Sequence, residues 1–268
     1  MIAATAILAL SSCEEPGGEV SSIGGQGVDR SAAVKPQTLT GRVTTVDGKP
    51  LKGVKVYAGN PLWDRAYVAG GKTTATDEEG SYTIPELRSS QVYKTFAWMP
   101  LKYRGKDFCL RVSPATPEGY TEFPGSKGAV RDFTWKLHGK IQDSSEEGYY
   151  GGSIQIFPNF TDGNYKGKVE LQLTPTSLLA DGSHGNPLSR IANLGPNMAL
   201  DIPLGAYKVS ATRIKEDGTR APLKVGTSSS PSASRYANIE FEPEYQLACK
   251  AGPGNSSGIA RAYLNVMG

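Results

Sequence analysis

Alternation of apolar and polar side chains marks much of the chain as short β-strands. Residues 39–45, 53–57 and 168–173 alternate, and their aliphatic side chains, such as Val54 and Val56, fall on one face. A period of two places one face of a strand against a core and the other in water. No window of a dozen residues keeps the apolar spacing of an amphipathic helix without a glycine or proline interrupting it. The pattern therefore predicts an all-β fold.

Composition supports short strands joined by tight turns. The chain contains 32 glycines and 18 prolines, and turn signals such as Asp47-Gly48 separate the alternating segments. After removal of an export signal, about 250 residues suit two ordinary domains. We expect these domains at residues 37–130 and 131–268.

Two glycine pairs suggest that the second half repeats the first. Gly41 and Gly53 are twelve positions apart, and so are Gly139 and Gly151. The strands expected at 137–141 and 151–157 would then repeat those that contain the first pair. Two tandem β-sandwich domains follow from this spacing, with an unrelated second β-sandwich as the alternative.

The second half carries one further sign of repetition. Residues 199–211 read as strand, turn and strand, in the manner of residues 81–84 and 92–97. The segment 259–266 is expected to be a last strand that completes a sheet.

The first half resembles the carboxypeptidase regulatory-like domain. The resemblance lies in an ordered set of turn glycines and alternating residues: Gly41-x-Val43, Gly48-x-Pro50-Leu51-x-Gly53-Val54-x-Val56 and Thr76-Asp77-x-x-Gly80-x-Tyr82. It implies that the first sandwich is prealbumin-like. Members of that family are mostly non-catalytic accessory modules of peptidases, outer-membrane receptors and surface proteins, so the resemblance implies a fold rather than a ligand.

The first thirteen residues are uncharged and end in Leu10-Ser11-Ser12-Cys13, which resembles the lipidation signal of bacterial lipoproteins. The apolar run is too short to span a bilayer. The resemblance implies that Cys13 is acylated and binds a lipid bilayer. Residues 14–36 are rich in Gly and Ser and bury too little apolar surface to fold, so we expect them to form a flexible linker. We therefore expect a cell-envelope protein, with the outer membrane or cell surface favoured. Because no Lys or Arg precedes Arg30, a plain secretory signal and a fortuitous apolar start remain alternatives.

If Cys13 is acylated, Cys109 and Cys249 are left as a pair. In an oxidising compartment such a pair is expected to form a disulfide, here tying the two sandwiches together. Two separately buried thiols are the alternative.

Catalytic motifs are missing from the sequence. The chain has two histidines, His138 and His184, and neither begins a His-x-x-Glu zinc motif. No nucleophile elbow and no phosphate-binding loop occur. We expect no enzyme activity, metal or cofactor, and a hydrolase is only a distant alternative. The net charge of +3 gives no reason to expect a nucleic-acid partner.

Loop aromatics are the candidate ligand contacts. Trp63, Tyr149 and Tyr150 lie in turn-rich segments, whereas Trp98 and Trp135 continue alternating strands and should be core. For the three loop residues, packing within the domain is the favoured interpretation and ligand binding is the alternative. These observations predict a non-catalytic, membrane-anchored structural or interaction module, with a carbohydrate-binding accessory protein as the alternative. Its partner would be a cell-envelope protein or polysaccharide.

Overall fold

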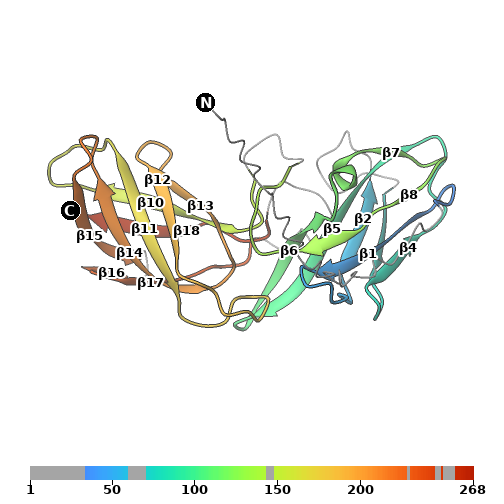
Figure 1. The fold of residues 1–268 in the computed structure, drawn as a ribbon, viewed down its shortest axis with the longest axis horizontal. Helices are drawn as coiled ribbons and strands as arrows, with labels where there is room; N and C mark the ends of the chain where they lie inside the picture. The colour runs from blue at the N-terminus through green and yellow to red at the C-terminus, as the bar shows by residue number, and fades with distance from the viewer. Residues whose placement is uncertain (1–33, 60–70, 143–147, 228–229, 245–248, 250–256) are drawn as a thin grey trace, which may run out of the picture. The chain divides into compact units, whose positions relative to one another are not determined.

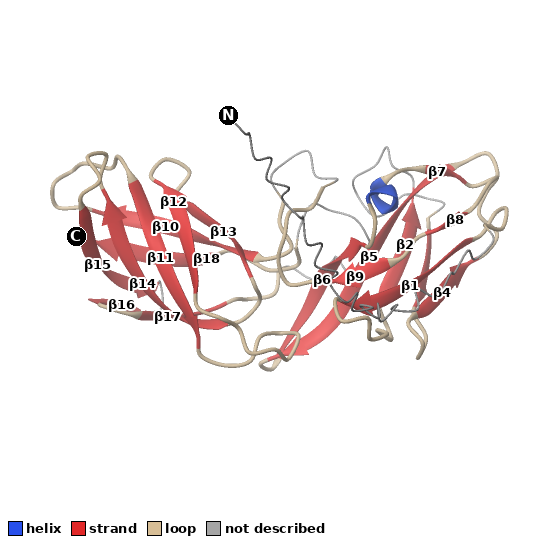
Figure 2. Ribbon diagram, viewed as in Figure 1, coloured by secondary structure: helices blue, strands red, loops and turns tan. Residues whose placement is uncertain are grey.

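The fold is all-β and consists of two sandwich-like domains (Figures 1 and 2). The computed structural model describes residues 34–59, 71–142, 148–227, 230–244, 249 and 257–268. The short 3-10 helix Pro117–Tyr120 lies between β6 and β7. Within these described ranges no helix is long and apolar enough to cross a bilayer.

The first sheet contains nine strands, seven of which follow the order β3-β2-β5-β6-β9-β1-β4. Of the other two, β7 pairs with β5 and β8 with β1. The strands are β1 (Leu39–Thr45), β2 (Lys55–Gly59), β3 (Lys72–Ala75), β4 (Ser81–Ile84), β5 (Val92–Tyr103), β6 (Lys106–Pro114), β7 (Phe123–Pro124), β8 (Ala129–Val130) and β9 (Phe133–Trp135).

The second sheet also contains nine strands, and its main path is β12-β11-β14-β15-β18-β10-β13. Here β16 pairs with β15 and β17 with β14. The strands are β10 (Gly152–Asn159), β11 (Lys168–Pro175), β12 (Leu188–Asn193), β13 (Met198–Ile202), β14 (Ala206–Ile214), β15 (Arg220–Thr227), β16 (Ser230–Ser234), β17 (Ala237–Glu240) and β18 (Ala262–Met267).

The two main paths have the same topology. Replacing β1 to β6 by β10 to β15, and β9 by β18, converts one order into the other. In both sheets the first strand pairs in parallel with the last one, as β1 with β9 and β10 with β18. The other neighbours along both paths are antiparallel. The predicted pair of tandem sandwiches is therefore confirmed.

A short sequence motif occupies the same place in both sandwiches. Tyr93-Lys94-x-x-Ala97 begins at the second residue of β5, and Tyr207-Lys208-x-x-Ala211 at the second residue of β14. Both tyrosine rings are fully buried. The hydroxyl of Tyr93 accepts a hydrogen bond from the backbone N–H of Arg88 at 3.0 Å. The hydroxyl of Tyr207 donates one to the carbonyl of Pro203 at 2.8 Å. Each tyrosine thus fixes the loop that precedes its strand.

The predicted alignment of the repeat was wrong in one respect. Residues 137–141 form no strand, and only an isolated bridge joins Lys140 to Tyr149. The counterpart of β1 is therefore β10, which was expected to match the second strand of the repeat. The N–H of Gly139 instead donates to the Asp201 carboxylate at 2.8 Å, a contact that glycine spacing does not predict.

The structure confirms several other predictions from the sequence. Strands are present at 39–45, 72–75, 81–84 and 168–173, and β18 is the last strand of its sheet. Trp98 and Trp135 are buried, as expected. Strand β9 lies beyond the expected boundary after residue 130 and pairs with β1 and β6, so the first sheet extends to Trp135. The positions of the domain boundaries stay a prediction.

Candidate functional site

The candidate ligand aromatics do not form a common site. Trp63 and Cys13 lie outside the described residues. Tyr150 is 3% exposed, and its hydroxyl lies 2.8 Å from that of Tyr120, which in turn lies 3.2 Å from Ser113 Oγ. Burial raises the pKa of Tyr150. The prediction of Tyr150 as an exposed ligand contact is therefore wrong, because this ring packs and closes a hydroxyl chain. Tyr149 is half-buried.

The predicted disulfide is present. Cys109 of β6 is bonded to Cys249 in the connection between β17 and β18, with the two Cα atoms 5.6 Å apart. Next to it, the N–H of Arg111 donates to the carbonyl of Ser257 at 3.1 Å. Gly258 lies so close to the carbonyl of Cys109 that a Cβ there would fall 1.8 Å from the oxygen. The β17–β18 connection is thus fastened to β6 by a covalent bond, a backbone hydrogen bond and close packing.

Polar contacts join the β5–β6 hairpin to the second sandwich. Arg104 pairs with Glu240 at 2.7 Å, and Lys106 pairs with Glu242 at 2.6 Å. These ion pairs are exposed, so each contributes little to stability. The Tyr103 hydroxyl adds a hydrogen bond to the Leu178 carbonyl at 2.7 Å.

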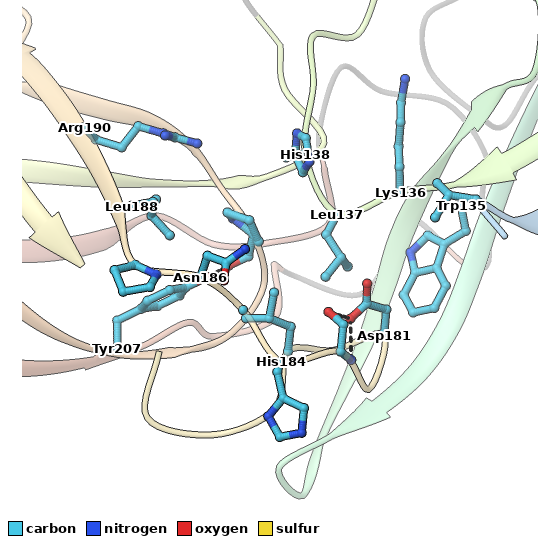
Figure 3. Close-up of a pocket in the computed structure, with 16 residues that line it drawn as sticks. Trp135, Lys136, Leu137, His138, Asp181, His184, Asn186, Leu188, Arg190 and Tyr207 are labelled. Atoms are coloured by element: carbon cyan, nitrogen blue, oxygen red, sulfur yellow. Dashed lines mark hydrogen bonds between the residues drawn. The ribbon is translucent and has the colours of Figure 1, made fainter. Parts of the chain in front are cut away.

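A pocket of about 390 Å³ contains both histidines of the chain (Figure 3). Its lining includes residues 135–138, which begin with the last residue of β9, and residues 183–187, which lead into β12. His138 and His184 lie on opposite sides of the view in Figure 3. Within the described residues, neither makes an ion pair with a carboxylate.

Two other polar residues of this pocket, Asp181 and Arg190, are held by local contacts. Asp181 accepts hydrogen bonds from the N–H and the hydroxyl of Ser183, at 2.9 and 2.6 Å. Arg190 donates to the carbonyls of Leu200 and Asp201 at 3.0 and 2.7 Å. Across the described ranges no group of three or more His, Cys, Asp or Glu side chains could hold a metal. The hydrogen bonds of Asp181 and Arg190 in this pocket thus serve the fold.

A different candidate site lies on the outward side of β10 and β18. Phe157 of β10 is 49% exposed and Tyr263 of β18 is 47% exposed. Their rings are nearly parallel, with centroids 5.9 Å apart. Among the ring pairs of the described residues, this is the one in which both rings are exposed. It is therefore the best-formed aromatic surface in the described part of the chain.

Sequence reasoning did not single out these two rings, although one signal was available. In β10 the buried residues Ile154 and Ile156 set the phase of the alternation, and Phe157 falls in the opposite phase. An aromatic residue on the solvent side of a strand is a candidate contact residue. What the sequence could not show is that β10 pairs with β18, which brings Tyr263 beside Phe157.

Comparisons with known proteins identify no family. No family model and no curated protein matches the chain. Similar solved structures include the Bacillus anthracis TIE protein, with 11% identity and a TM-score of 0.32 over 86% of this chain and 34% of that one. A streptococcal ancillary pilin has 12% identity and a TM-score of 0.27 over 85% of this chain and 61% of that one. The shaft pilin SpaA from Lactobacillus rhamnosus GG has 11% identity and a TM-score of 0.23, over 87% and 98% of the two chains. These distant similarities assign no function, and the carboxypeptidase regulatory-like resemblance stays a prediction.

Proposed function

We propose that this chain is a non-catalytic interaction module that works outside the cytoplasm, held at a membrane by an acylated Cys13. The observation that carries the proposal is the Cys109–Cys249 disulfide. Structural disulfides persist in secreted and envelope proteins and are rare in the reducing cytosol. The Leu10-Ser11-Ser12-Cys13 run resembles a lipidation signal, which would attach an exported protein to a membrane.

The interaction role rests on a difference between two surface regions, the histidine pocket and the exposed ring pair on β10 and β18. Asp181 and Arg190 of the histidine pocket are held by local hydrogen bonds. In contrast, the Phe157–Tyr263 pair exposes apolar rings that no other ring of the described residues covers. Exposed apolar surface on a folded domain is a feature of binding sites. A carbohydrate-binding accessory protein is the second candidate, and the same ring pair favours it.

The compartment and the anchor can be tested separately in cells. Mass spectrometry of the native protein should find an acylated Cys13 at the N-terminus. Cys13→Ser should move the protein from the membrane fraction to the soluble fraction, while the disulfide remains. Alkylation of denatured, non-reduced protein from the native compartment should modify neither Cys109 nor Cys249. Modification of both thiols would refute an extracytoplasmic location, and an unmodified Cys13 would refute the anchor alone.

A further inference from the structure

The outward side of β10 and β18 forms one continuous strip of side chains, here called the β10–β18 face. It consists of Gln155, Phe157 and Asn159 from β10, Arg261, Tyr263, Asn265 and Met267 from β18 and its preceding residue, and Lys224 from β15. From Arg261 to Met267 the strand rises by roughly 20 Å, at about 3.3 Å per residue. The strip is thus long enough for several units of an extended polymer.

Two stacked, exposed rings lie in the middle of this face. Phe157 and Tyr263 keep about half of their surface in water, at outward strand positions that a small polar residue could also occupy. Neither ring contributes to the buried core, whose side chains in these strands are Ile154, Ile156, Leu264 and Val266. A flat apolar ring is a platform for another flat group, such as the C–H face of a pyranose.

Amide side chains flank the rings. Asn265 pairs in register with Phe157, and Asn159 lies two residues further along β10. Each Asn amide offers both donors and an acceptor, which suits the hydroxyl groups around a sugar ring. Gln155 differs, because its amide donates to the carbonyl of Asn197 at 3.1 Å and is already used by the fold.

The ends of the face are positively charged. Arg261 lies at one end, and Lys224 and Arg235 line a pocket of about 890 Å³ at the other end, together with Asn159 and Met267. None of these three cations forms a salt bridge with a carboxylate of the described residues. The face and its pocket contain no acidic side chain among their described residues. Cations without a protein counterion attract an anionic ligand.

The first sandwich serves as an internal control for these features. In the corresponding strand pair, β1 and β9, Thr44 lies opposite Thr134 and no ring points outward next to them. The cation on that side, Arg42, donates to the carbonyl of Glu79 at 2.8 Å. Strand topology therefore does not require the rings, amides and cations of the β10–β18 face.

We propose that the β10–β18 face and the pocket at its end bind an acidic polysaccharide, with Phe157 and Tyr263 stacking on sugar rings, Asn159 and Asn265 bonding hydroxyls, and Lys224, Arg235 and Arg261 pairing with carboxylates. The proposal names the ligand of the interaction module proposed above and rests on that role. It depends on neither the acyl group nor the disulfide.

Binding of oligogalacturonide and alginate oligosaccharides to the purified full-length chain tests the proposal. Calorimetric titration should show binding of at least one acidic oligosaccharide that weakens with added salt. Methyl-esterified oligogalacturonide, which keeps the sugar rings but loses the charge, should bind more weakly. Phe157→Thr and Tyr263→Thr install the residue type of the first sandwich and keep a good strand former. Each should weaken binding about tenfold, the equivalent of one lost stacking contact.

Tyr165→Ala provides the matched control. Tyr165 is 48% exposed and also stacks on a phenylalanine, but it lies outside the β10–β18 face. This variant should leave the affinity unchanged. An equal loss for Tyr165→Ala, equal binding of the esterified ligand, or no binding of either acidic oligosaccharide would overturn the proposal. So would a dimer of the native chain that Tyr263→Thr converts to a monomer, since the face would then bind a second copy.

The outcomes separate this proposal from the proposed function. If the protein is acylated and disulfide-bonded but binds neither acidic glycan, the proposed location stands and only the proposed ligand is refuted. If the thiols are free but the protein binds acidic glycans through Tyr263, the proposed ligand stands and the proposed location is refuted.

Discussion

The two sandwiches share a strand order but use their outer faces differently. On β5 the outward residues Phe96 and Trp98 are buried, whereas the matching residues of β14, Ser210 and Thr212, are partly exposed. The guanidinium of Arg111 lies over the rings of Phe96 and Trp98, 4.7 and 5.4 Å from their centroids. In the second sandwich the stacked pair of exposed rings lies instead on β10 and β18. The inward residues therefore set a common fold, and the outward residues give each copy its own contacts.

The disulfide is the strongest link between the two copies, and its removal is expected to have the largest effect. In the double variant Cys109→Ala/Cys249→Ala, a closed loop with a sequence separation of 140 residues is opened. The chain-entropy relation puts the lost stability at about 5 kcal/mol. Scanning calorimetry should show one unfolding transition for the oxidised protein and two for the variant. Coincident transitions in both would mean that non-covalent contacts alone couple the sandwiches.

The two faces of β10 can be separated by substituting neighbouring residues. Ile156 is 1% exposed, so Ile156→Ala should cost about 2–5 kcal/mol of unfolding free energy. Phe157→Thr, at the next residue, should change that free energy by no more than about 0.5 kcal/mol. Urea denaturation measures both. A large loss for Phe157→Thr would show that its ring stabilises the fold and would weaken the case for a binding face.

The shared tyrosine can be tested in both copies at once. Tyr93→Phe and Tyr207→Phe each remove one hydroxyl that fixes a preceding loop, which should cost about 1 kcal/mol apiece. The two effects should add in the double variant, because the residues belong to different sandwiches and share no partner. Urea denaturation of the single and double variants checks the sum. A clear departure from additivity would show that the two loops are coupled.

The smallest expected effect is a pH dependence confined to the second sandwich. Arg213 stacks on Phe160 at 4.0 Å and pairs with Asp162 at 2.9 Å. Hydrogen bonds from the Asn164 backbone and from Arg213 lower the pKa of Asp162. The native state thus favours the ionised carboxylate. Its contribution is complete above the ordinary aspartate pKa, about 4, and is lost as the pH falls through the lowered value.

Asp162→Asn removes this titration. The melting temperature of the native chain should fall more between about pH 5 and pH 2 than that of the variant, by a small margin because Asp162 is exposed. Parallel curves for the two proteins would show that the pair contributes no pH dependence.

Local pattern predicted the strands well because alternation directly reports which side chains face a core. Residues 39–45 are an example, and the predicted bounds match β1. The prediction of a strand at 137–141 failed because the N–H of Gly139 donates a hydrogen bond to Asp201, a partner far along the chain. The β10–β18 face was missed for a related reason. Each ring faces outward by its own local pattern, but the face forms only when the first and last strands of the second sheet pair.

Pairing of the first strand with the last also sets the order in which the protein can be completed. Strand β10 obtains its parallel neighbour only when β18 arrives, at the end of the second sheet. A chain that emerges with its N-terminus first would therefore hold β10 and β15 as open edges until β18 is available. Open edges invite pairing with other chains, and non-local pairing slows folding. The period before β18 pairs is thus when the second sheet is most exposed to aggregation.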